Sequence, residues 1–192
     1  DEIGLCRRPT GGRAIFHGNE LTYSVIMPKT IMGKNELYEG IHQSFSSAFN
    51  TLGLKTELTQ RSSDFVKFNK SAEALSCFSA SAKSEVTVNG KKFIGSAQRI
   101  YENTILQHGS IMLSEDYLKL MHYANLPAEI KLQTEKLMRE KTYHWNLETT
   151  NLSLEKLTKS LTLHFINSFQ ISESTLFDLS LINKNLSILE CV

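Results

Sequence analysis

The stretch that decides the fold reads Val86-Thr87-Val88-Asn89-Gly90-Lys91-Lys92-Phe93-Ile94-Gly95-Ser96-Ala97. Asn89-Gly90 is the preferred two-residue turn of a β-hairpin, because both positions tolerate positive φ. Residues 86–88 supply the strand before the turn, and residues 91–97 are predicted to form the returning strand. The turn also sets the register, so we expect Lys91 and Lys92 to point to opposite faces.

On the N-terminal side of this hairpin, the pattern predicts two strands and one helix. Residues 14–17 are short and apolar, and residues 21–26 alternate with β-branched and aromatic side chains, as strands do. Residues 36–52 are typical of an amphipathic helix that ends at Gly53. The apolar stripe of this helix consists of Leu37, Ile41, Phe45, Ala48, Phe49 and Leu52.

On the C-terminal side, one further strand is predicted over residues 104–113, and the rest of the pattern is helical. Helices are expected over residues 114–123 and 127–141, and Ser153 can cap a third. The buried stripe expected for the third helix consists of Leu154, Leu157, Leu161, Phe165 and Phe169. Strands followed by helices predict an α+β fold with one mixed or antiparallel sheet flanked by helices.

Bulk composition indicates an ordinary globular protein. The 192 residues suit one domain over residues 1–192, with 41% hydrophobic and 21% charged side chains. The net charge of +1 excludes a strong field directed at nucleic acid or a membrane surface. No stretch approaches the roughly 20 apolar residues that a transmembrane helix needs.

The cysteines and histidines argue against structural metal and disulfides. Cys6, Cys77 and Cys191 are far apart and form no CxxC motif, which favours a reducing cytoplasm over a secreted disulfide framework. His17 and His108 have no acidic partner at ligand spacing, so we predict no metal site.

Three segments could carry chemistry, and each also has an ordinary structural interpretation. Gly11-Gly12 would let the backbone approach a ligand, with Arg7, Arg8 and Arg13 available for an anion; a basic surface loop is the alternative. Lys92 could point into a cleft, although hairpin lysines usually face solvent. His108 could serve a site, although histidines within strands are more often hydrogen-bonded core residues.

Taken together and in order, these segments resemble the biotin/lipoate protein ligase and lipoyl/octanoyl transferase family. The resemblance rests on Arg7-Arg8-Pro9-Thr10-Gly11-Gly12-Arg13-Ala14, Glu20-Leu21-Thr22-Tyr23-Ser24-Val25, Cys77-Phe78, Gly90-Lys91-Lys92 with Gly95-Ser96-Ala97-Gln98, and Leu106-Gln107-His108-Gly109-Ser110-Ile111. It implies a class II biotin ligase/synthetase-like catalytic domain, and it implies that the family's N-terminal segment is missing before residue 1.

The first two motifs resemble the cysteine-using octanoyltransferase branch of this family. That branch implies transfer of an octanoyl or lipoyl group from acyl carrier protein to a lysine of a lipoyl-domain or glycine-cleavage carrier protein. Cys77 would form the thioester, Lys92 would assist it from across the cleft, and no cofactor would be needed. Two alternatives remain: a lipoate-protein ligase that uses ATP and Mg²⁺, and an inactive homologue that only binds acyl groups or carriers.

The resemblance also implies a substrate pocket. Its lining residues would be Arg8, Thr10, Gly11, Gly12, Arg13, Ala14, Phe16, His17, Gly95, Ser96, Ala97, Gln98, His108 and Gly109.

Overall fold

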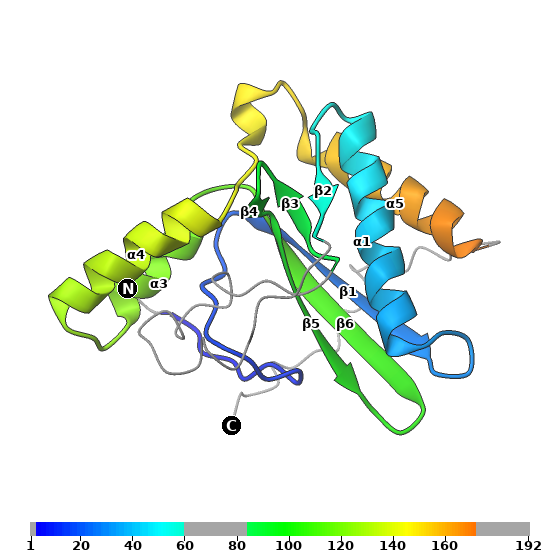
Figure 1. Ribbon diagram of the computed structural model, residues 1–192, viewed down its shortest axis with the longest axis horizontal. Coiled ribbons are helices and arrows are strands. Elements are labelled where there is room, and N and C mark those ends of the chain that lie inside the picture. Colours follow the sequence, from blue (N-terminus) through cyan, green and yellow to red (C-terminus); the bar gives the residue numbers. More distant parts are fainter. Residues whose placement is uncertain (1–2, 60–83, 172–192) are drawn as a thin grey trace, which may run out of the picture.

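Two three-stranded antiparallel sheets form the centre of the computed structural model, which describes residues 3–59 and 84–171 (Figure 1). The large sheet has the strand order β1-β6-β5, and the small sheet has the order β2-β3-β4. The strands are β1 (Glu20–Pro28), β2 (Glu57–Leu58), β3 (Val86–Val88), β4 (Lys91–Lys92), β5 (Ile94–Ile100) and β6 (Thr104–Met112). With the helices that flank it, this arrangement confirms the predicted α+β fold, but the strands form two antiparallel sheets where one sheet was predicted.

The Asn89-Gly90 hairpin forms as predicted, but the returning strand is interrupted. Asn89 and Gly90 have φ values of 51° and 73°, as the turn requires. The chain then leaves the small sheet at Phe93, whose amide donates to Val86 O (3.0 Å) while its carbonyl accepts from Met112 N (3.3 Å). The prediction of one strand over residues 91–97 was therefore wrong, because Phe93 hydrogen-bonds to a different sheet on each side.

Helix α1 (Lys34–Thr51) covers one face of the large sheet, and α5 (Leu154–Phe169) packs beside α1 (Figure 1). The predicted stripe of α1 is buried except for Leu52, which is half-buried just after the helix ends, and the centroid of the Phe49 ring lies 4.8 Å from that of Phe93. Ser153 caps α5 by accepting a hydrogen bond from Lys156 N at 3.1 Å. Leu154, the first residue of α5, is 51% exposed, so its predicted burial was wrong, whereas Leu157 and Leu161 are buried as predicted.

The remaining helices are the 3-10 helix η3 (Asp116–Lys119), α3 (Leu120–Tyr123), α4 (Ala128–Lys141) and the 3-10 helix η4 (Leu147–Thr149). At the other side of the molecule α3 packs against α4 and η3, whereas η4 stands apart from them, on the path into α5 (Figure 1). η3 with α3, and then α4, confirm the helices predicted over residues 114–123 and 127–141. Among the described residues, no helix combines the length and the apolar character needed to cross a membrane.

Residues 14–17, predicted as a strand, form an extended segment with a single bridge at Ala14. In residues 8–13, just before this segment, hydrogen bonds of side chains take the place of strand pairing. Thr10 Oγ1 lies 2.6 Å from His108 Nε2, and Arg8 donates to the carbonyl of Arg13 at 2.6 Å. The prediction failed because the segment's apolar pattern reflects packing of Ile15 on a small core cluster, not strand pairing.

Candidate active site

A buried ion pair between Lys92 and Glu85 lies at the centre of the candidate site. Lys92 is 5% exposed and Glu85 is 2% exposed, and Lys92 Nζ lies 2.6 Å from Glu85 Oε1. The hairpin brings them together, because Glu85 directly precedes β3 and Lys92 pairs with Thr87 across the turn. Charged groups are rarely buried unless they are paired, so each of these two residues depends on the other for its burial.

Lys91 behaves differently from its neighbour. Its Nζ donates to the carbonyl of Arg139 at the surface, at 3.1 Å. The two lysines therefore point to opposite faces of β4, as the alternation of side chains along a strand requires. The structure thus selects Lys92 as the lysine held inside the protein.

His42, from the middle of α1, connects this region to the large sheet. Its Nδ1 lies 2.7 Å from Ser84 O, and its Nε2 lies 2.7 Å from Ser96 Oγ. Burial lowers the pKa of His42 to about 4, the charge of Lys92 acts in the same direction, and the Ser84 carbonyl opposes them. The imidazole is therefore neutral at pH 7. Since a carbonyl only accepts, Nδ1 carries the hydrogen and Nε2 accepts from the Ser96 hydroxyl.

The same chain of hydrogen bonds continues through Tyr23 to the far end of β5. Because the Ser96 hydrogen points at His42, the Tyr23 hydroxyl must donate to Ser96 Oγ, at 2.6 Å. Tyr23 in turn accepts from Gln107 Nε2 at 3.1 Å, and Gln107 Oε1 accepts from Gln98 Nε2 at 2.8 Å. Gln98 also donates to Lys34 O at 2.9 Å. The donors and acceptors are thus oriented in a single direction from Gln98 to Ser84.

Gly109 leaves room for this chain. A Cβ at Gly109 would lie 2.4 Å from Gly95 O and 2.7 Å from the ring of Tyr23. The register places Gly109 opposite both Tyr23 and Ser96. The Tyr23 ring can therefore lie across β6 and reach Ser96 only because residue 109 has no side chain. Burial raises the pKa of Tyr23 to about 12, so its hydroxyl keeps its proton.

The segment with two glycines packs against the other face of the large sheet. Gly11 and Gly12 have φ values of 66° and 94°, which glycine adopts at little cost. Thr10 contacts His108 there, and Arg99 of β5 donates to the carbonyl of Pro9. The pKa of His108 is lowered by burial first and then by Arg8 and His17.

The predicted binding residues are thus divided between two faces. Paired residues of an antiparallel sheet share a face, so Gly95, Ala97 and His108 lie on the side of the two-glycine segment. Ser96, Gln98 and Gly109 lie on the α1 side, in the chain described above.

The remaining predicted binding residues lie outside β5 and β6, in the segment that precedes β1. Phe16 stacks on Tyr123 with ring centroids 5.6 Å apart, and exposed His17 lies 2.5 Å from Glu20. Arg13 is half-buried and Ala14 is exposed. Cys77 lies outside the described residues, as do Phe78 and Cys191, and Cys6 is exposed.

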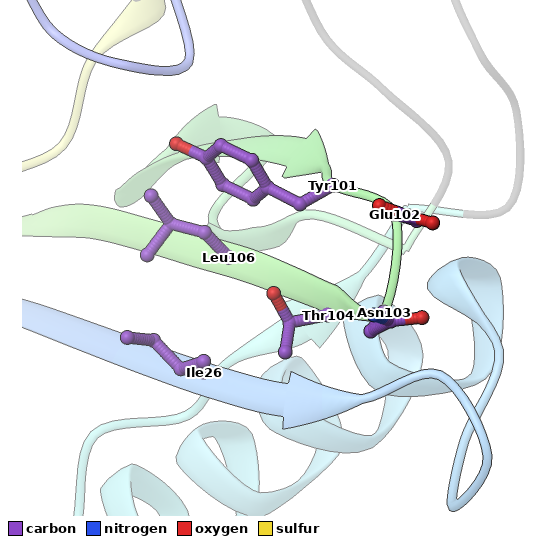
Figure 2. Close-up of a pocket in the computed structure, with 6 residues that line it drawn as sticks. All are labelled: Ile26, Tyr101, Glu102, Asn103, Thr104 and Leu106. Carbon is purple, nitrogen blue, oxygen red and sulfur yellow. The ribbon is translucent and has the colours of Figure 1, made fainter.

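Two hollows mark the surface of the large sheet, and neither includes Lys92. One, of about 560 Å³, lies at the end of the β5–β6 hairpin and continues the His108 face (Figure 2). It is lined by Ile26, Tyr101, Glu102, Asn103, Thr104 and Leu106. The other, of about 230 Å³, is an apolar groove between β1 and α5. Within the described residues, no three His, Cys, Asp or Glu side chains gather as metal ligands would.

Sequence reasoning missed three polar residues of the site: His42, Tyr23 and Gln107. His42 and Gln107 are fully buried. A signal was available for His42, because it lies beside Ile41 and three residues before Phe45, both in the apolar stripe, and buried polar side chains need partners. Their partners are distant in sequence, so the pattern alone could not identify them.

Solved structures place this architecture among the lipoate- and biotin-ligase catalytic folds. A crystal structure of lipoate-protein ligase A bound with ATP superposes with a TM-score of 0.64 at 18% identity, covering 95% of this chain and 67% of that one. A bipartite lipoate protein ligase from Thermoplasma acidophilum gives 0.67 at 19% identity, covering 94% and 65%. A biotin protein ligase from Aquifex aeolicus gives 0.51 at 12% identity, covering 85% and 58%.

Sequence comparison identifies the family directly. Residues 1–166 match the lipoyl protein ligase A/B catalytic domain, and the chain belongs to that family. Octanoyltransferase LipM of Brevibacillus brevis is 34% identical over 185 residues, 92% of this chain and 67% of that protein. LipM of Clostridioides difficile is 43% identical over 122 residues, 62% of this chain and 44% of that protein. The chain therefore spans between about half and two thirds of these relatives.

Proposed function

We propose that this chain carries the transfer site of an octanoyltransferase. It would move an octanoyl group from acyl carrier protein to a lysine of a lipoyl-domain or glycine-cleavage carrier protein. The observation that carries the proposal is the buried Lys92, held at 2.6 Å by Glu85 on a hairpin that follows, in the sequence, the segment containing Cys77. Relatives of 34–43% identity that are named octanoyltransferase LipM support the same activity.

Cys77 is the proposed nucleophile. Its thiolate attacks the carbonyl carbon of the octanoyl thioester, the bond from that carbon to the carrier's sulfur breaks, and the carrier leaves as a thiol after taking up a proton. The octanoyl group is then a thioester on Cys77. The amine of the acceptor lysine attacks this thioester, loses a proton and forms an amide, and Cys77 is released.

Lys92 would stabilise the negative charge that develops on the carbonyl oxygen in both steps. The ammonium group of Lys92 is a hydrogen-bond donor, and it donates to Glu85 Oε1 at 2.6 Å. Glu85 thereby fixes where the ammonium lies before substrate arrives, and a donor that is already in place costs no reorganisation during the reaction. A cation near Cys77 would also favour the thiolate.

The proposed chemistry needs neither ATP nor a metal ion, because the thioester already activates the acyl group. The two-glycine segment and the residues of β5 on the same face, Gly95 and Ala97, would bound the acyl site, and the arginines of that segment would meet acidic carrier surfaces. A reducing cytoplasm would suit a free Cys77 thiol.

Mass spectrometry after incubation with octanoyl-acyl carrier protein tests this proposal. We expect one octanoyl group on the peptide that contains Cys77, no adduct on Cys77→Ser, and an unchanged adduct on the matched controls Cys6→Ser and Cys191→Ser. An adduct that persists in Cys77→Ser would overturn the thioester mechanism. Strict dependence on ATP with free octanoate or lipoate would identify a ligase instead, and binding without any transfer would identify an inactive homologue.

A further inference from the structure

Ser84 adopts a backbone conformation that its residue type disfavours. Its φ is 63°, in the left-handed region, which is unfavourable for a residue other than glycine. Such a conformation persists only where surrounding contacts hold it. Ser84 N donates to Thr59 O at 2.7 Å, and Ser84 O accepts from His42 Nδ1 at 2.7 Å.

The residue that follows Ser84 is Glu85, the partner of Lys92. Glu85 N donates to Thr59 Oγ1 at 2.9 Å, and Thr59 N donates to Glu85 O at 3.0 Å. These bonds hold the Glu85 backbone from one side. The turn at Ser84 determines the direction in which the backbone enters Glu85. It therefore also determines where the carboxylate of Glu85 meets Lys92.

His42 is itself fixed on its other sides. It is fully buried, its Nε2 accepts from Ser96, and the Tyr38 ring contacts it edge-on at 4.2 Å. An imidazole held by the sheet and by α1 can therefore serve as a rigid anchor for the Ser84 carbonyl.

We infer that His42 is a positioning residue for Lys92: its imidazole anchors the left-handed turn at Ser84 to β5, and the turn places Glu85 so that it holds the Lys92 ammonium. The inference rests on the proposed function for the role of Lys92 in the reaction. Within the part of the chain that the structure describes, the hydrogen bonds of His42 go to Ser84 and Ser96, so its effect on Lys92 passes through Ser84 and Glu85.

Two substitutions test the hydrogen bonds of the two His42 ring nitrogens separately. In His42→Asn, the side-chain amide can occupy the position of Nδ1 and donate to Ser84 O, while the bond to Ser96 is lost. In His42→Gln, the longer amide can occupy the position of Nε2 and accept from Ser96, while the bond to Ser84 is lost. His122→Gln, at an exposed position of α3, is the matched control.

Amide hydrogen exchange and steady-state kinetics should both be measured on these variants, with circular dichroism to establish folding. In His42→Gln we expect the amides of Ser84 and Glu85 to exchange about 5-fold faster, as loss of one hydrogen bond implies. We expect kcat to fall about 10-fold, with KM for octanoyl-acyl carrier protein within about 2-fold, because a displaced catalytic group slows the chemical step. His42→Asn should recover most of both effects.

The outcomes distinguish this inference from the proposed function. If Lys92→Arg is inactive but His42→Gln and His42→Asn behave alike in exchange and in kcat, the positioning role falls and the function stands. The role also falls if exchange at Ser84 and Glu85 in His42→Gln matches that of His122→Gln. If Lys92→Arg retains full activity, the function assigned to Lys92 falls, and faster exchange in His42→Gln alone would still support the anchoring of Ser84.

Discussion

Lys91 and Lys92 are adjacent in sequence, and their environments predict opposite responses to substitution. Lys92→Arg keeps the charge but replaces a compact ammonium, held inside the protein by Glu85, with a longer planar group. We expect it to lower the transfer rate roughly 10²–10³-fold, as removal of an oxyanion donor does. Lys91→Arg should stay within about 2-fold of the unmodified protein, because the Lys91 ammonium donates to a carbonyl at the surface. Acyl transfer to a carrier domain measures both, and equal mild effects would contradict the catalytic role.

The Lys92–Glu85 pair also predicts a non-additive effect on stability. Glu85→Gln or Lys92→Met leaves the opposite charge buried, and breaking a buried pair in this way costs about 3–5 kcal/mol. The double variant removes both charges, so its free energy of unfolding should fall by less than the sum of the single effects. Urea denaturation of the three variants measures this difference. Strict additivity would show that the two groups do not interact in solution.

At the scale of the elements, the contact of β5 with β6 depends on Gly109. In Gly109→Ala, the new methyl group would overlap the carbonyl oxygen of Gly95, which belongs to the neighbouring strand and cannot rotate away. Separating the strands should cost about 1–3 kcal/mol, as overpacking does in cores. Gly4→Ala, where no atom lies within 4 Å, is the control. Thermal unfolding compares them, and equal melting temperatures would contradict the predicted overlap.

Elements governed by local chemistry were predictable from the sequence. The Asn89-Gly90 turn, the stripe of α1 and the Ser153 cap all follow from neighbours within a few residues. The end of β4 was not predictable, because the backbone of Phe93 hydrogen-bonds to Val86, which precedes it, and to Met112, which follows it in a different sheet. The link from His42 to Ser96 was also hidden, because helix periodicity shows that a position is buried but not what lies opposite.

The candidate site could be predicted only in part from the sequence. The resemblance selected Lys92, and the structure shows why that lysine is distinct from Lys91. The resemblance placed Ser96 and Gln98 in the substrate pocket, whereas their side chains form hydrogen bonds in the chain to His42. That role depends on which face of β5 meets α1, which the sequence motif does not specify.

For the whole molecule, His42 predicts a loss of stability in acid. Burial lowers the pKa of His42 to about 4 in the folded protein, from the value of 6.5 that an exposed histidine has. The unfolded chain therefore binds a proton first as the pH falls. The contribution of neutral His42 is complete above pH 6.5 and is lost progressively down to pH 4, up to about 3 kcal/mol.

Urea unfolding as a function of pH isolates this contribution. His42→Gln should show a shallower decline in the free energy of unfolding between pH 6.5 and pH 4, while His122→Gln should retain the full slope. His108, whose pKa is also lowered, contributes with the same sign in all three proteins and cancels in the comparison. Parallel curves for His42→Gln and the unmodified protein would contradict the burial of a neutral His42.

The pairing of β1 with β6 has a consequence for the kinetics of folding. The β3–β4 and β5–β6 hairpins close short loops, whereas β1 must wait for a partner that follows α1 and every other strand. Contacts between distant segments slow folding, because the loop entropy is lost before the contacts compensate for it. The hairpin that presents Lys92 should therefore form early and β1 should dock late. Substitutions in β1 would then accelerate unfolding and leave the refolding rate nearly unchanged.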